Sequence, residues 1–161
     1  IDMNTELKDK ILPREIGGWL YLLGFGVILT PFTFLTEMLD YYKDIDLMLS
    51  INYLAFTIFY LIEMIVNLAF FIISIYLVFL FVYRRVEFPK LYKFFIILGA
   101  IFLFLDTVAA MILFPEISFA DIFSPDFVRS MARQIVTLII WVPYLIYSVR
   151  VKETFLVKHN F

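Results

Sequence analysis

Four long apolar stretches, separated by short charged segments, constrain what this chain can fold into. A helix needs about 20 mostly apolar residues to cross the roughly 30 Å hydrocarbon core of a bilayer. All four stretches meet that length. The sequence therefore predicts an all-α integral membrane protein, a bundle of four transmembrane helices in one domain over residues 1–161. The helices are expected at about residues 16–36, 51–83, 94–115 and 125–149.

Composition excludes a soluble domain and several classes of chemistry. Of the 161 residues, 63% are hydrophobic and 17% charged, against about 45–50% and about 25% in soluble domains. A chain this short cannot bury so much apolar surface in one soluble core. It has no cysteine and a single histidine, His159, which excludes disulfides, thiolate nucleophiles and a histidine metal site within one chain. We therefore expect no metal, no cofactor and no nucleic-acid partner.

The basic residues predict the orientation of the helices. Lys and Arg favour the cytoplasmic ends of membrane helices. In the four-helix threading, 10 of the 13 basic residues fall on one side, which is also the side of both termini. We therefore expect a multi-pass protein of the bacterial inner (cytoplasmic) membrane with both termini in the cytoplasm. The basic residues on that side are Lys8, Lys10, Arg14, Arg84, Arg85, Lys90, Lys93, Arg150, Lys152 and Lys158.

Prolines mark the connections between the expected helices. The segment Glu-Phe-Pro-Lys at 87–90 is typical of a short turn between the second and third helices. Ser124, Pro125 and Asp126 form the pattern of a helix start, with a hydroxyl cap, a proline at the first position and an acid at the positive end of the dipole. The segment 115–123 fits either a short interfacial element or a hydrophobic loop packed on the helix ends.

Five polar residues lie at membrane depth in these helices. Ionisable groups there are costly and usually face the bundle interior with a partner. Side chains lean toward the N-terminus of their own helix, so Asp106 leans toward the bilayer centre and cannot reach the headgroups. We expect Asp106 inside the bundle, within salt-bridge reach of Arg133 or Arg129, with Glu63 nearby. The polar cluster predicted in this way consists of Glu63, Asn67, Asp106, Arg129 and Arg133.

The polar cluster has three interpretations. An ion pair that only fixes helix packing favours a non-enzymatic accessory or scaffold subunit, which we take as the leading interpretation. The alternative is a small transporter or lipid-binding protein with a polar site near the outer leaflet for a proton, an ion or an anionic headgroup. Paired acids also suggest an intramembrane aspartyl hydrolase, but the Asn- and Gly-rich motifs of such four-helix enzymes are lacking. Expected partners are membrane lipids, with another membrane protein or a second copy of the chain as further candidates.

Prolines and aromatic residues inside the helices predict bends and interfacial anchors. Pro31 and Pro143 each remove a backbone hydrogen bond, so the first and fourth helices are expected to bend there. Trp19, Trp141 and Tyr144 lie near the expected cytoplasmic interface, where amphipathic rings anchor helices.

Two motifs resemble a known family. The first is Gly-Gly-Trp-Leu at 17–20, and the second comprises Trp-Val-Pro-Tyr at 141–144 with Arg-Val-Lys-Glu-Thr-Phe at 150–155. In this order the motifs resemble an uncharacterised bacterial family of four-helix inner-membrane proteins, classed only as a domain of unknown function. The resemblance covers residues 16–155 and implies a fold and a location, with no activity attached.

Overall fold

The computed structural model describes residues 14–50, 54–113, 123 and 125–156. The elements within these residues are all α-helices, and four of them are long. The helices are α2 (Trp19–Ser50), α3 (Leu54–Val82), α4 (Phe88–Leu113), α6 (Pro125–Tyr147) and the short α7 (Val149–Thr154).

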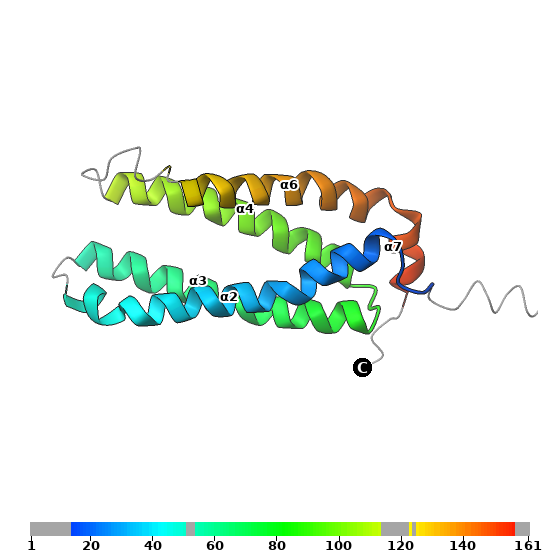
Figure 1. Cartoon of the computed structure of the whole chain (residues 1–161), viewed down its shortest axis with the longest axis horizontal. Coiled ribbons are helices and arrows are strands. Elements are labelled where there is room, and N and C mark those ends of the chain that lie inside the picture. Colours follow the sequence, from blue (N-terminus) through cyan, green and yellow to red (C-terminus); the bar gives the residue numbers. More distant parts are fainter. Residues whose placement is uncertain (1–13, 51–53, 114–122, 124, 157–161) are drawn as a thin grey trace, which may run out of the picture.

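The long helices form two pairs that lie side by side. Helix α2 packs along α3, and α4 packs along α6 (Figure 1). The two pairs lie close together at the end that carries α7, here called the α7 end, and they separate toward the opposite end (Figure 1). Each of the four long helices contains a stretch long and apolar enough to cross a membrane. The chain is therefore a multi-pass membrane protein built as a four-helix bundle.

Helix α2 is longer than the sequence predicted. We expected the first helix to end near residue 36, before the acidic residues, but α2 continues to Ser50. The stretch that can span a membrane ends at Asp40. The error has a simple cause. Acidic residues end an apolar stretch, but they do not end a helix. A helix is ended by residues such as glycine or proline, and α2 contains neither after Pro31.

The turn between α3 and α4 is tighter than expected. Helix α4 begins at Phe88 and not near residue 94, because Pro89 occupies its first turn, where a proline needs no hydrogen-bond partner. Arg84, two residues after the end of α3, has its backbone in the left-handed region, at φ 50°. The Arg85 amide donates to the Leu80 carbonyl at 2.9 Å, which closes the last turn of α3 in a Schellman pattern.

Aromatic rings fill the α7 end of the bundle. Phe88 is fully buried, and its ring lies 5.1 Å from that of Phe81 and 4.7 Å from that of Phe155, measured between ring centroids. Helix α6 ends before Ser148, whose hydroxyl accepts a hydrogen bond from the Val151 amide and caps α7. Because rings from α3, α4 and the residue after α7 meet here, the space between the helix pairs lies toward the opposite end.

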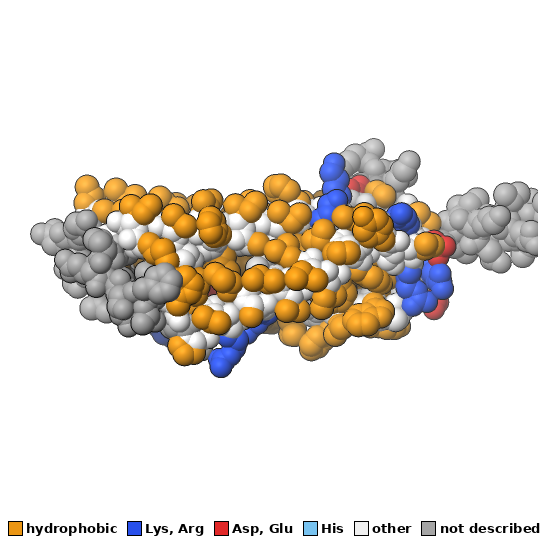
Figure 2. Space-filling model, turned by 90° about the horizontal axis from the view of Figure 1, so that it is seen from above, with side chains coloured by type: hydrophobic (Ala, Val, Ile, Leu, Met, Phe, Trp, Pro, Cys, Tyr) orange, Lys and Arg blue, Asp and Glu red, His pale blue; other side chains and the backbone are white. Residues whose placement is uncertain are grey.

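The outer surface matches a membrane environment. Hydrophobic side chains run along most of the length of the face in Figure 2, and most of its Lys and Arg side chains gather toward the α7 end. Many large apolar side chains that point outward from the helices are exposed, as at Ile112 and Ile139. In a bilayer these side chains contact lipid, so their exposure carries no penalty.

Candidate functional site

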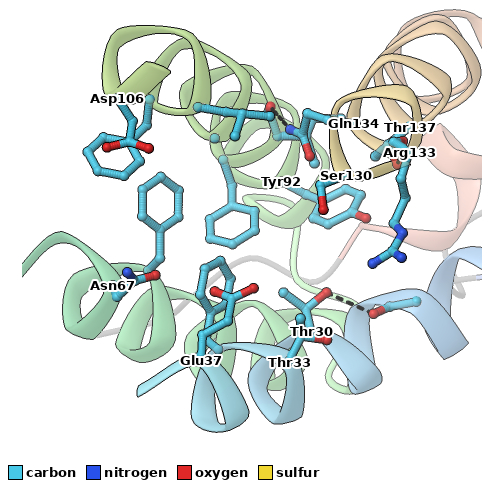
Figure 3. Close-up of a pocket in the computed structure, with 18 of the residues that line it drawn as sticks. Thr30, Thr33, Glu37, Asn67, Tyr92, Asp106, Ser130, Arg133, Gln134 and Thr137 are labelled. Atoms are coloured by element: carbon cyan, nitrogen blue, oxygen red, sulfur yellow. Dashed lines mark hydrogen bonds between the residues drawn. The ribbon is translucent and has the colours of Figure 1, made fainter. Parts of the chain in front are cut away.

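A pocket of about 490 Å³ lies between the two helix pairs, and all four long helices line it. We call it the central pocket. Three of its charged members, Glu63, Asp106 and Arg133, lie about two helical turns from the ends of α3, α4 and α6 that are opposite α7. Its polar lining consists of Thr30, Thr33, Glu37, Glu63, Asn67, Tyr92, Asp106, Ser130, Arg133, Gln134 and Thr137, ten of which are labelled in Figure 3.

Helix α2 contributes a polar stripe to the central pocket. Gly26, Thr30, Thr33 and Glu37 follow one another at spacings of three or four residues and so share one face. The Thr30 hydroxyl donates to the Gly26 carbonyl at 2.8 Å, in the same helix. A Cβ atom at Gly26 would meet no other atom within 4 Å, so the pocket is open beside this position. Glu37 points from this stripe into the pocket (Figure 3).

Three carboxyl groups from three helices reach the central pocket. They belong to Glu37 of α2, Glu63 of α3 and Asp106 of α4. Beside them, Asn67 is 92% buried and points toward the pocket in Figure 3, and it has no hydrogen-bond partner among the described residues. An amide side chain has both hydrogen-bond donors and an acceptor to offer to a molecule in the pocket. The pocket therefore holds polar groups that the described protein does not satisfy.

The expected ion pair at Asp106 does not form. Asp106 Oδ1 is buried and has no hydrogen-bond partner among the described residues, and no described arginine forms a salt bridge with this carboxyl group. Arg133 also lines the central pocket, but it points toward α2, where it interacts electrostatically with Glu37 (Figure 3). Depth along the helices alone predicted the pairing. The rotation of α6 about its axis directs Arg133 to a different acid.

Gln134 joins α4 to α6 at the wall of the central pocket. Its Nε2 atom donates to the backbone carbonyl of Ile96 at 2.9 Å. Gly99 allows this approach, since a Cβ atom there would lie 3.3 Å from the same Nε2 atom. The contact holds the polar face of α6 against α4 and keeps Ser130, Gln134 and Thr137 on the pocket side.

Aromatic rings form the apolar part of the central pocket. Phe70 is the centre of this group, with its ring centroid 5.6 Å from that of Phe34, 5.3 Å from that of Phe95 and 6.1 Å from that of Phe102. These four residues come from α2, α3 and α4 and all line the pocket. Carboxyl groups and aromatic faces therefore share one cavity.

A second cavity, the lateral groove, lies between α3 and α4. It measures about 480 Å³ and is apolar except for two carboxyl groups. Glu63, Phe102 and Asp106 line both the lateral groove and the central pocket. The two cavities therefore meet at the two acids. The remaining lining of the lateral groove consists of Ala55, Ile58, Phe59, Ile62, Leu105, Ala109 and Leu113.

The structure divides the sequence-predicted residues into two groups. Glu63, Asn67, Asp106 and Arg133 line the central pocket, whereas Arg129, one turn before Arg133 on α6, does not. The predicted cap Ser124 lies outside the described residues, as does segment 115–123 except for residue 123, but α6 does begin at Pro125.

The predicted anchors and prolines have different surroundings. Trp19 is 62% exposed at the start of α2, while Trp141 lines the central pocket and contacts the ring of Tyr144. Their role as interfacial anchors stays a prediction. Helix α2 changes direction partway along its length in Figure 1 and contains Pro31. Helix α6 continues through Pro143, where the bend stays a prediction.

Several pocket residues were missed from the sequence. Glu37 lies just beyond the expected end of the first helix at about residue 36, and Thr30, Thr33, Tyr92 and Gln134 were not singled out. The spacing of Gly26, Thr30, Thr33 and Glu37 is the signal that predicts their common face. The spacing of Ser130, Gln134 and Thr137 is a similar signal on α6, whereas no comparable pattern marks Tyr92 in the second turn of α4.

The two sequence motifs meet at the α7 end. The backbone of Gly18 lies in the left-handed region, at φ 58°, and a Cβ atom there would lie 2.7 Å from Arg150 Nη1. Arg14 forms a salt bridge with Glu153 at 2.7 Å, and its amide donates to the Glu153 carbonyl at 3.0 Å. The beginning and the end of the described chain are thus joined.

Comparison with known proteins agrees with this motif pairing. The model of a family described as "Protein of unknown function (DUF2569)" matches residues 13–156, a range that includes both motifs. The chain belongs to this family. No curated protein and no solved structure matches it. The family has no assigned activity, so a functional proposal has to come from the central pocket itself.

Proposed function

We propose that this protein binds a ligand in the central pocket and acts as a small transporter or lipid-binding protein of the bacterial inner membrane. The observation that carries the proposal concerns Asp106, a lining residue of the central pocket, whose buried Oδ1 atom has no hydrogen-bond partner among the described residues. A carboxyl group at membrane depth is costly unless it is paired or protonated. An ion pair that only fixed packing would satisfy Asp106 within the bundle.

The proposal includes binding without catalysis. Catalytic hydroxyls are activated by a hydrogen-bonded base. The hydroxyls of Thr30, Thr33 and Thr137 instead donate to backbone carbonyls of their own helices, at 2.8, 3.4 and 2.8 Å. Their oxygen atoms are left as hydrogen-bond acceptors at the pocket wall. This arrangement suits recognition of a ligand.

The proposed orientation places both termini in the cytoplasm. It is supported by the basic residues near the α7 end, among them Arg84, Lys90 and Arg150, which belong on the cytoplasmic side by the positive-inside rule. Glu63, Asp106 and Arg133 then lie in the outer half of the membrane, and Tyr92 and Trp141 extend the pocket lining toward the cytoplasmic side. Membrane lipids surround the exposed apolar side chains of all four long helices.

Cysteine labelling tests whether the central pocket holds water. The chain has no cysteine, so in each single-cysteine variant all labelling comes from the introduced residue. N-ethylmaleimide reacts with the thiolate, which forms in water and not in hydrocarbon. Thr33→Cys and Ser130→Cys, both in the pocket lining, are expected to react in nanodiscs, and the matched outward-facing variant Ile139→Cys is not.

A lack of reaction at both pocket positions would mean a dry bundle. In that case the proposal fails, and the protein is better explained as an accessory or scaffold subunit. Labelling after unfolding in detergent verifies that each cysteine is present and reactive.

A further inference from the structure

The two cavities together have the shape of a site for an amphiphile. The central pocket holds polar groups beside aromatic rings, and the lateral groove is apolar except for two carboxyl groups. Glu63, Phe102 and Asp106 line both cavities. A molecule that spans this junction places a polar head near the two acids and an apolar tail between α3 and α4. The groove side chains Ile58, Ile62 and Leu105 are about half exposed, so a tail can enter from the surrounding lipid.

The lining favours a head that carries positive charge. Among the described lining residues of the central pocket, Arg133 is the one cation, and Asp106 is an acid whose buried Oδ1 atom has no described partner, while Glu63 has an interaction of its own. Arg133 already interacts electrostatically with Glu37 and forms no salt bridge with Asp106. A cation at the junction of the cavities offers Asp106 the opposite charge that the described protein does not supply.

The hydrogen-bonding groups favour a head with N–H donors. Thr30 and Thr33 donate to carbonyls of their own helix, and Gln134 Nε2 donates to the Ile96 carbonyl. The oxygen atoms of these three side chains therefore serve as acceptors. Asn67, 92% buried and without a described partner, adds a further carbonyl oxygen. An ammonium group has donors and no acceptor, which matches such a wall.

Aromatic faces beside the acids suit the same head. Phe102 lines both cavities and contacts Phe70, whose ring belongs to the aromatic part of the central pocket. Cations bind over aromatic faces, most strongly where water is excluded.

From these observations we propose that the ligand is a cationic amphiphile of the alkylamine class. Its protonated amine binds at Asp106 and Glu63, and its hydrocarbon tail lies in the lateral groove. This inference rests on the proposed function and names the ligand class for the same site.

Fluorescence of Trp141 provides a direct test. The chain has two tryptophans, so Trp19→Phe leaves Trp141, a lining residue of the central pocket, as the sole reporter. The quenchers are three piperidine nitroxides. The first is 4-(dodecylamino)-TEMPO, with both charge and tail, the second is 4-amino-TEMPO, with charge alone, and the third is 4-dodecanoylamido-TEMPO, with a tail and no charge. Each is titrated into the protein in lipid vesicles, with unlabelled dodecylamine as competitor.

The charged, tailed probe is expected to quench saturably and to be displaced by dodecylamine. The other two probes are expected to bind at least about tenfold more weakly, since each lacks one of the two contacts. Equal quenching by the uncharged amide would show simple partition into lipid and overturn the inference. Equal quenching by the tail-less amine would show that the lateral groove takes no part, and the ligand would then be a soluble amine.

Two variants locate the head and the tail. Asp106→Asn keeps the shape of the side chain and is expected to weaken binding of the charged, tailed probe about 10- to 100-fold. The matched control is Asp40→Asn, an exposed acid on α2 that pairs with Lys43 outside the pocket, and it is expected to bind normally. Ala109→Leu fills the lateral groove and is expected to weaken binding of the charged, tailed probe but not of the tail-less 4-amino-TEMPO. Unchanged binding in both pocket variants would contradict the assignment.

The outcomes separate this inference from the proposed function. If the pocket cysteines react but the protein shows no preference for the cationic probe, the pocket is water-filled and its ligand is of a different class. Unreactive pocket cysteines overturn the proposed function itself.

Discussion

Asp106 and Arg133 line the same pocket from neighbouring helices, yet they form no salt bridge. Arg133 interacts electrostatically with Glu37 of α2, on the other helix pair. The two charged groups at the pocket wall are therefore held in place by helix packing and not by each other. This separation leaves the Asp106 carboxyl group available to a ligand.

The separation predicts how the two residues combine in a double variant. Asp106→Asn and Arg133→Gln remove groups that share no hydrogen bond or salt bridge. Their effects on the free energy of unfolding in detergent are expected to add within about 0.5 kcal/mol. The measurement is a double-mutant cycle by denaturant titration. If the double variant loses clearly less free energy of unfolding than the sum of the two single losses, the ion pair that the sequence predicted does form.

Gly24 and Gly26 of α2 are expected to respond oppositely to alanine. A Cβ atom at Gly24 would lie 2.5 Å from two atoms of the Phe81 ring, and Phe88 and Phe155 pack against that ring. Gly24→Ala is therefore expected to destabilise the protein by about 1–3 kcal/mol through overpacking.

Gly26→Ala is the matched control, because a Cβ atom there meets nothing within 4 Å. It is expected to be neutral or to stabilise α2 by up to about 1 kcal/mol, since alanine is the better helix former. Thermal unfolding in one detergent compares the two variants. Equal destabilisation by both would show that α2 does not approach Phe81 this closely.

Gly18 at the α7 end is expected to tolerate alanine less well than Gly17. Gly18 has φ 58°, and its Cβ atom would lie 2.7 Å from Arg150 Nη1, against 3.0 Å at Gly17. The left-handed backbone alone costs an L-residue about 1–2 kcal/mol. Gly18→Ala should therefore lower the melting temperature more than Gly17→Ala.

The variant Arg150→Ala separates the two causes at Gly18. In that background Gly18→Ala is expected to keep the backbone part of its loss, because removing the guanidinium relieves only the contact. Complete rescue by Arg150→Ala would show that φ at Gly18 adjusts freely.

Reporter fusions test the proposed orientation. A cytosol-active reporter placed after Phe161 is expected to be active, and one inserted near Lys43 is expected to behave as exported, because 10 of the 13 basic residues lie on the side of the termini. Alkaline phosphatase fused at the same two positions gives the reciprocal readout. Export of the reporter after Phe161 would contradict the orientation.

The sequence alone predicts the membrane bundle, because the signals that define it are local. A window of about 20 apolar residues specifies a spanning helix whatever its neighbours do. The same local reasoning places Glu63, Asp106 and Arg133 at similar depths, and the structure finds all three in one pocket. This local reasoning left Glu37 outside the first helix, because an acid ends an apolar stretch. In the structure α2 continues past Glu37 to Ser50.

Only the tertiary structure decided which polar groups face one another. That choice depends on how each helix is rotated about its axis, and the rotation follows from contacts between segments far apart in the chain. Phe81 packs against Gly24, and Gln134 binds the Ile96 carbonyl beside Gly99. Depth along a helix is a property of the local sequence, whereas rotation is a property of packing. The sequence therefore determined the layer in which Asp106 lies, and packing left its buried Oδ1 atom without a hydrogen-bond partner among the described residues.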